Sequence, residues 1–172
     1  MAGFPIRTAA ELMDTDFEAR WTARETIGGS ARVTLGAILD RFVASGGPIA
    51  IGALDVPALD TDKVASAVAE LDHADLVAVR DGAIVLAYPF ASVPTGFVTR
   101  FADGAERHAC CAIDALGIAA MLRASITVRA TCHHCGEPLT IPVDPDGPRG
   151  HADVMAWVGR RDAVRAKACE GL

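Results

Sequence analysis

The chain has 172 residues, of which 51% are hydrophobic, and it carries a formal net charge of −6 at pH 7. This length suits one domain or two small lobes, and the apolar content is enough for a core without disulfides or a structural metal. The negative charge argues against nucleic acid or an anionic membrane as a partner, because both favour a basic protein face. We therefore expect neither.

The N-terminal 22 residues mix charged and apolar side chains, so no secretory signal peptide is expected. No uninterrupted apolar run approaches the roughly 20 residues that a membrane-spanning helix needs. These features predict a cytoplasmic protein. In that compartment, clustered cysteines indicate metal binding or catalysis more often than disulfides.

The first half of the chain predicts a helical arm, residues 1–30, followed by a lobe of two helices and a hairpin, residues 31–88. Thr34 is a plausible N-cap of the first helix in this lobe, and Asp60 or Thr61 of the second.

An Asp81-Gly82 turn between two β-rich runs predicts the hairpin, and the order of elements resembles a winged helix. The second helix makes DNA binding improbable, because Lys63 is the only lysine or arginine between residues 60 and 75. A recognition helix with that acidic balance would repel phosphate. We therefore interpret the lobe as scaffold.

The second half, residues 89–172, predicts an α+β core with a small mixed or antiparallel sheet. The expected strands cover residues 97–101, 106–109, 125–130 and 139–143, and an apolar, buried helix covers 111–122. The last twenty residues also look helical.

Four of the five cysteines lie within residues 110–135. If the helix begins at Cys111, its exposed N–H groups and dipole should lower the pKa of that thiol. Asp114, three residues later, would share its helix face. A thiolate and a carboxyl side by side supply a soft-metal ligand and a group that moves protons. The structural alternative, in which Asp114 caps the helix and Cys110 and Cys111 are small core residues, stays open.

Cys132-His133-His134-Cys135 resembles one zinc knuckle in a turn between two strands. A structural zinc site needs four ligands, and no second knuckle follows. A mixed site that holds Zn(II) or Cu(I) with Cys111, Cys132, Cys135 and a histidine stays open. No phosphate-binding or nucleotide motif appears, so no organic cofactor is expected.

The segment Ala109-Cys-Cys-Ala-Ile-Asp-Ala-Leu116 resembles the aromatic-Cys-Ala-Leu-Asp-Thr-Leu helix start of the organomercurial (alkylmercury) lyase family. Residues 136–143, Gly-Glu-Pro-Leu-Thr-Ile-Pro-Val, are similar to that family's Thr-Gly-x-Pro-Val-x-Leu-x-Val. The helical lobe and Tyr88-Pro-Phe also match its N-terminal organisation. The similarity covers about residues 30–143 and identifies a shortened, divergent member.

The resemblance implies cleavage of a carbon–mercury bond, with Hg(II) as the bound product. By position, Cys111 is the nucleophile, Asp114 handles the proton, and Cys132 falls on a strand-end cysteine that usually has a structural role. The family's second catalytic cysteine lies beyond the later strand, where this sequence has only Cys169.

The resemblance therefore implies that a different second thiol closes the mercury site, and we expect it to be Cys132 or Cys135, with Cys110 as a further candidate. A small organometallic substrate, cellular thiols and a mercuric reductase are the implied partners. The alternative is a non-catalytic metal-binding protein that uses Cys111, Cys132 and Cys135 for Zn(II) or Cu(I).

Overall fold

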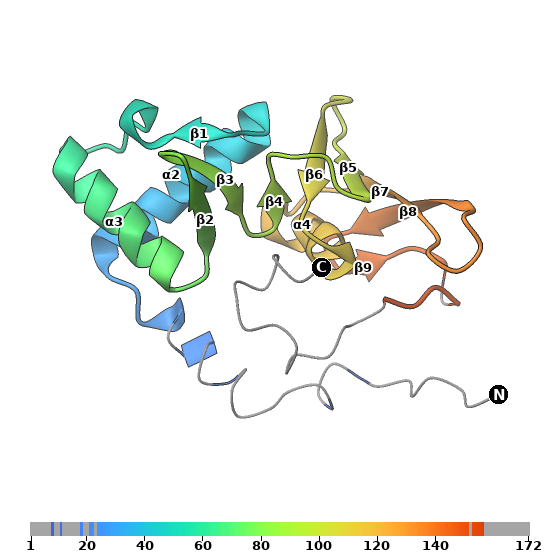
Figure 1. Ribbon diagram of the computed structural model, residues 1–172. Helices are drawn as coiled ribbons and strands as arrows, with labels where there is room; N and C mark the ends of the chain where they lie inside the picture. Colours follow the sequence, from blue (N-terminus) through green and yellow to red (C-terminus); the bar gives the residue numbers. More distant parts are fainter. Residues whose placement is uncertain are drawn as a thin grey trace.

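The computed structural model describes residues 8, 11, 18, 21–22, 24–151 and 153–156 (Figure 1). Most of the predicted N-terminal arm lies outside these residues. So do Cys169 and nearly all of the helix expected at the C-terminus, although the described residues 153–156 are not helical. The described part combines helices with an antiparallel sheet, which confirms the predicted α+β class.

The first helix of the lobe, α2, spans Gly29–Ser45 and starts five residues before the expected N-cap. The prediction that Thr34 caps it is wrong, because Thr34 is fully buried inside α2. Ala31, Thr34, Ile38 and Phe42 form one buried stripe at helical spacing. Packing of α2, chiefly against α3, extends the helix back through the weak helix formers Gly29 and Ser30.

The second helix, α3, spans Thr61–His73 and has the predicted cap: the Lys63 N–H donates to Asp60 Oδ1 at 2.9 Å. The hairpin is also confirmed, with β2 at Val77–Arg80 and β3 at Ala83–Ala87. Asp81 and Gly82 both have positive φ, as a two-residue turn of this kind requires.

The described strands form one nine-stranded sheet in the order β1-β3-β4-β6-β5-β7-β8-β9, with β2 paired to β3. Every pair is antiparallel. The remaining strands are β1 Ile49–Ala50, β4 Phe90–Ala91, β5 Phe97–Arg100, β6 Glu106–Ala109, β7 Ile126–Thr131, β8 Pro138–Asp144 and β9 Gly147–Pro148, and a short 3-10 helix covers Ile51–Ala53. The sheet crosses the expected border at residues 88–89, and the division into domains stays a prediction.

Helix α4, Ala112–Leu122, packs against strands β5 to β9. Ala115, Ile118 and Ala119 are buried in the same core cluster as the apolar side chains of β7 and β8. Ile113 is 59% exposed, so the expectation of a buried helix holds for one side of α4 and not for the other. The helix covers a single face of the sheet, and its other side faces solvent.

The order of strands brings Cys110, Cys111 and Cys132 to one end of the sheet. Strands β6 and β7 both pair with β5 in antiparallel fashion, so they run in the same direction, and α4 connects them. The C-terminal ends of β6 and β7 therefore lie at the same end of the sheet, two strand spacings or about 10 Å apart. Cys110 and Cys111 follow β6, and Cys132 follows β7. No helix in the part of the chain that the structure describes is long and apolar enough to cross a membrane.

Candidate functional site

Cys111 and Asp114 contact each other at the start of α4. Cys111 is the N-cap of this helix, with an extended backbone, and its Sγ accepts the Asp114 N–H at 3.4 Å. The Cys111 thiol in turn donates to Asp114 Oδ2 at 3.0 Å. The local sequence thus produces a thiol and a carboxyl in direct contact, as the three-residue spacing predicts.

The electrostatics of this pair differ from the prediction. Burial, followed by the hydrogen bond to Asp114, raises the pKa of the Cys111 thiol from 9.0 to about 12. The expected lowering is therefore wrong, because the N–H groups of the helix start do not outweigh burial and a neighbouring carboxylate. Burial also raises the pKa of Asp114, while the bond from Cys111 and the charge of Arg24 partly offset this rise. The Cys111 thiol therefore keeps its proton at neutral pH until a soft ion displaces it.

Arg24 is a neighbour of the site that the sequence analysis missed. Its guanidinium donates to Asp75 Oδ2 at 3.1 Å and to the Asp75 carbonyl at 3.0 Å. It also lies over the Tyr88 ring, 5.7 Å from the centroid. No local signal connects Arg24 with Asp114, because 90 positions separate them in the sequence.

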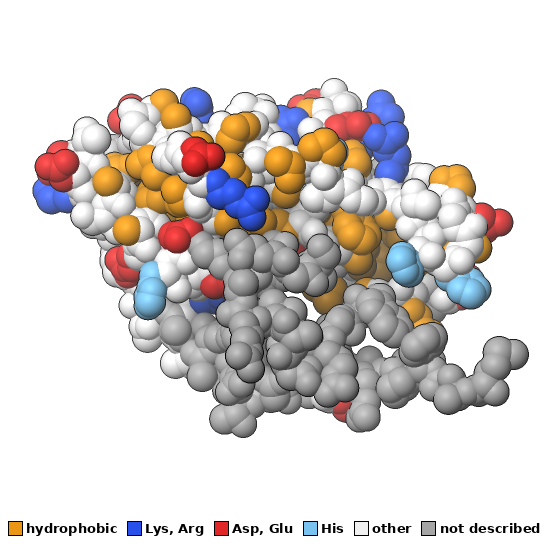
Figure 2. All heavy atoms as spheres, in the orientation of Figure 1, with side chains coloured by type: hydrophobic (Ala, Val, Ile, Leu, Met, Phe, Trp, Pro, Cys, Tyr) orange, Lys and Arg blue, Asp and Glu red, His pale blue; other side chains and the backbone are white. Residues whose placement is uncertain are grey.

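Cys110 points into a different environment from its neighbour. Its N–H donates to the Pro89 carbonyl at 3.0 Å, and its thiol to the Phe90 carbonyl at 3.4 Å. Cys110 lines a cleft of about 590 Å³, which Cys111 does not line. Apolar side chains are prominent on the face drawn in Figure 2, and the apolar lining of the cleft includes Val85, Leu86, Tyr88, Val93, Pro94 and Phe97.

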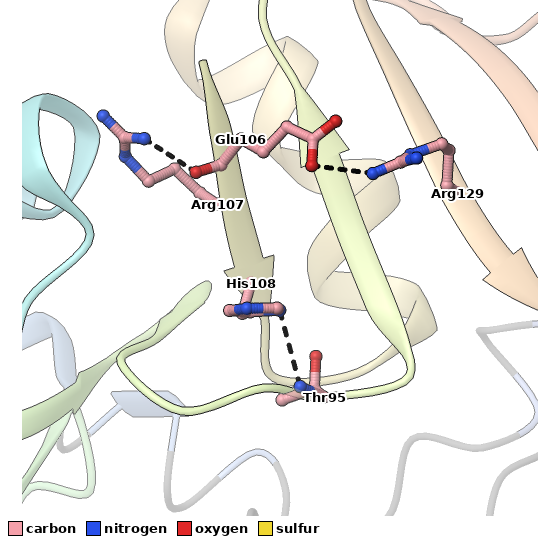
Figure 3. Close-up of polar contacts among 5 residues, drawn as sticks. All are labelled: Thr95, Glu106, Arg107, His108 and Arg129. Carbon is pink, nitrogen blue, oxygen red and sulfur yellow. Dashed lines mark hydrogen bonds and ion pairs between the residues drawn. The ribbon is translucent and has the colours of Figure 1, made fainter.

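The loop from β4 to β5 is hydrogen-bonded to β6, the strand that precedes Cys110 and Cys111 (Figure 3). Thr95 donates through its hydroxyl to the Ala109 carbonyl at 2.7 Å and through its N–H to His108 Nδ1 at 3.5 Å. Because Thr95 also lines the cleft, these bonds fix the cleft wall to the end of β6.

Strand β6 is held from both sides. Glu106 pairs with Arg129 of β7 at 2.7 Å, across the intervening strand (Figure 3). Arg107 extends the other way and donates to the carbonyls of Phe42, Val43 and Ala44 at the end of α2. This anchoring of β6 positions the start of α4, and with it Cys111.

Cys132 and Cys135 form a second thiol pair in the turn between β7 and β8. The Cys132 N–H donates to the Glu137 carbonyl at 2.8 Å, and the Gly136 N–H to the Cys132 carbonyl at 2.9 Å. The backbone N–H groups of Cys135 and His134, together with the Cys135 thiol, donate to the Cys132 sulfur and lower its pKa. His133 and His134 are both exposed.

The structure divides the predicted ligand set into two pairs, Cys111 with Asp114 and Cys132 with Cys135. Both pairs lie toward the same end of the sheet. Within residues 24–151 and the other described positions, no group of three or more His, Cys, Asp or Glu side chains could hold a metal ion.

Comparisons with known proteins point to one family. A family model described as alkylmercury lyase matches residues 90–171. Curated alkylmercury lyases of Bacillus cereus and Clostridium butyricum are each 39% identical over 44 residues, which is 26% of this chain and 20% of theirs. The matched segment thus spans one fifth of the length of these relatives.

The fold is also similar to that of a solved structure, the mercury-bound form of MerB2. The TM-score is 0.61 at 20% sequence identity, over 79% of this chain and 66% of that chain. The resemblance to the alkylmercury lyase family expected from residues 109–116 is confirmed, and residues 90–171 are the part of the chain that the family model matches.

Proposed function

We propose that this protein cleaves carbon–mercury bonds and releases a hydrocarbon and Hg(II), a role in mercury resistance. The observation that carries the proposal is the 3.0 Å contact between the Cys111 thiol and the Asp114 carboxylate. Thiolates are the preferred ligands of soft metal ions, and a carboxyl beside the metal can deliver a proton. The contact supports the proposal because the reaction requires these two groups side by side.

In the first step, the Cys111 proton passes to Asp114 as the sulfur bonds to mercury and displaces the thiolate that carries the organomercurial. Protonated Asp114 then gives this proton to the carbon atom, the carbon–mercury bond breaks, and the hydrocarbon leaves. Burial, which raises the pKa of Asp114, supports this role because it favours the protonated form.

A second thiolate must then complete the coordination of Hg(II), and we favour Cys132. It follows β7 at the edge where Cys111 follows β6, and the turn lowers its thiol pKa. Cys135 and Cys110 are the remaining candidates among the described residues. Cellular thiols or a mercuric reductase would then take the ion.

Four further expectations remain part of the proposal. The reaction needs no organic cofactor, and neither nucleic acid nor membrane is a partner. The protein acts in the cytoplasm. Residues 31–88 form a winged-helix-like scaffold.

The non-catalytic alternative, with Zn(II) or Cu(I) on Cys111, Cys132 and Cys135, is not favoured. The family match is to alkylmercury lyases. The described part of the chain also contains no group of three such ligands.

The test combines native mass spectrometry with a hydrocarbon assay on reduced protein incubated with phenylmercury. The parent should release benzene and retain one Hg(II). Asp114→Ala should bind Hg(II) but release no benzene, whereas Asp62→Ala, which removes an exposed carboxylate from α3, should match the parent. Retention of intact phenylmercury by the parent would contradict the proposal, as would turnover of Asp114→Ala at the parent rate.

A further inference from the structure

The turn between β7 and β8 holds two thiols in a fixed arrangement that the cleavage step does not fully use. Two backbone hydrogen bonds close the turn, from Cys132 to Glu137 and from Gly136 to Cys132. Gly136 has a φ of 74°, the left-handed conformation that glycine adopts most readily. The Cys135 side chain is a hydrogen-bond neighbour of the Cys132 thiol within this turn.

We infer that Cys132 and Cys135 form a second, self-sufficient site for a soft ion such as Hg(II) or Cu(I), complete without Cys111. Soft ions select thiolate ligands, and both Hg(II) and Cu(I) form stable complexes with only two thiolates. A tetrahedral zinc site would need four ligands. The described residues supply no third His, Cys, Asp or Glu in a common group with this pair.

Exposure distinguishes the two pairs. Cys135 is exposed and Cys132 is half-buried, so ions carried by external thiols can reach the turn directly. Cys111 bonds instead to a half-buried carboxylate. Inorganic ions should therefore load at the turn before they load at Cys111.

If the proposed cleavage occurs, Cys132 and Cys135 can bind the Hg(II) that it produces. The Cys135 sulfur would bond to Hg(II) held by Cys111 and Cys132, the bond from mercury to Cys111 would break, and the Cys135 proton would pass to Cys111. No oxidant or reductant is needed. The inference rests on the proposed function only for this role, because the pair's affinity for the ion does not depend on cleavage.

The test uses inorganic Hg(II) and Cu(I) separately, without any organomercurial, on full-length protein under anaerobic conditions with a non-thiol reductant. All variants carry Cys169→Ser. The first adds Cys110→Ser and Cys111→Ser, which leaves the turn as the only thiol pair. The second adds Cys132→Ser and Cys135→Ser to the first. Stoichiometry comes from native mass spectrometry, affinity from competition with a chromogenic chelator, and folding from circular dichroism.

The first variant should bind one ion with an affinity within about tenfold of the parent's tightest site, and the second should bind it more than about 100-fold more weakly. His133→Ala with His134→Ala, in the first variant, should change nothing. Failure of the folded first variant to bind an ion would overturn the inference, as would equal affinity in both variants. Tight Zn(II) binding that requires the histidines would replace it with a four-ligand site.

These outcomes are independent of catalysis. If the parent protein does not cleave carbon–mercury bonds, the binding of inorganic ions still tests the proposed site at Cys132 and Cys135. If the turn does not bind ions, the proposed cleavage at Cys111 and Asp114 is not contradicted.

Discussion

Replacement of Asp114 by Asn should make Cys111 more reactive while it abolishes cleavage. The pKa of the Cys111 thiol is about 12. At about pH 8, roughly one such thiol in ten thousand is ionised, against roughly one in ten for a thiol at the ordinary pKa of 9.0, since each pKa unit changes the ratio tenfold. Burial is the largest cause of the rise and remains in the variant, so only part of the difference should be recovered.

We expect alkylation of Cys111 by iodoacetamide at about pH 8 to be about tenfold faster in Asp114→Asn, which corresponds to a fall of about one unit in the thiol pKa. Both proteins should carry Cys110→Ser, so that the peptide contains one reactive sulfur and mass spectrometry reports on Cys111 alone. The pH dependence of the rate gives the pKa directly. An unchanged or slower rate, with an unchanged pKa, would refute the electrostatic reasoning.

The same variant should also change the pH dependence of stability. The folded-state pKa of Asp114 is raised above its unfolded value, so the folded protein holds this proton more tightly. Stability from this group is fully present below the unfolded pKa, near 3.8, and is lost as the pH rises through the folded value. Asp114→Asn should therefore have a higher Tm than the parent at neutral pH, and this advantage should disappear in acid.

Three other predictions concern the scaffold and can be checked by urea denaturation. Ile118→Ala should lower the free energy of unfolding by about 2–4 kcal/mol, because it opens a cavity between α4 and the sheet. Ile113→Ala, on the exposed side of α4, should lower it by less than about 0.5 kcal/mol. Thr99→Val should stabilise the fold by about 1 kcal/mol, since the buried Thr99 hydroxyl has no hydrogen-bond partner among the described residues. Arg24→Ala should cost about 1–3 kcal/mol because its ion pair is largely buried, while Lys63→Ala should cost less than about 1 kcal/mol because its pair is exposed. Equal costs within either matched pair would contradict the burial argument.

Local features of the fold could be predicted from the sequence. The Asp60 cap, the Asp81-Gly82 turn and the contact between Cys111 and Asp114 each depend on residues within a few positions of one another. Neighbouring residues fix such geometry whatever the rest of the chain does.

Features that depend on distant parts of the chain could not be predicted in the same way. The start of α2 depends on packing against α3, which outweighs the glycines at its N-terminus. The high pKa of the Cys111 thiol depends on burial at the end of a sheet whose strand order the sequence does not state. The position of Arg24 beside Tyr88 depends on a contact between residues that are 64 positions apart in the sequence.

The sulfur atom of Cys111 also serves as the hydrogen-bond acceptor at the start of α4, where it receives the Asp114 N–H. A mercury adduct would compete with that amide for the electron pairs of the sulfur. The amide proton of Asp114 should therefore act as a built-in spectroscopic reporter: its NMR resonance should shift, and its exchange with solvent should accelerate, whenever Cys111 is occupied. Occupancy of the site could then be followed in solution without a label and without turnover.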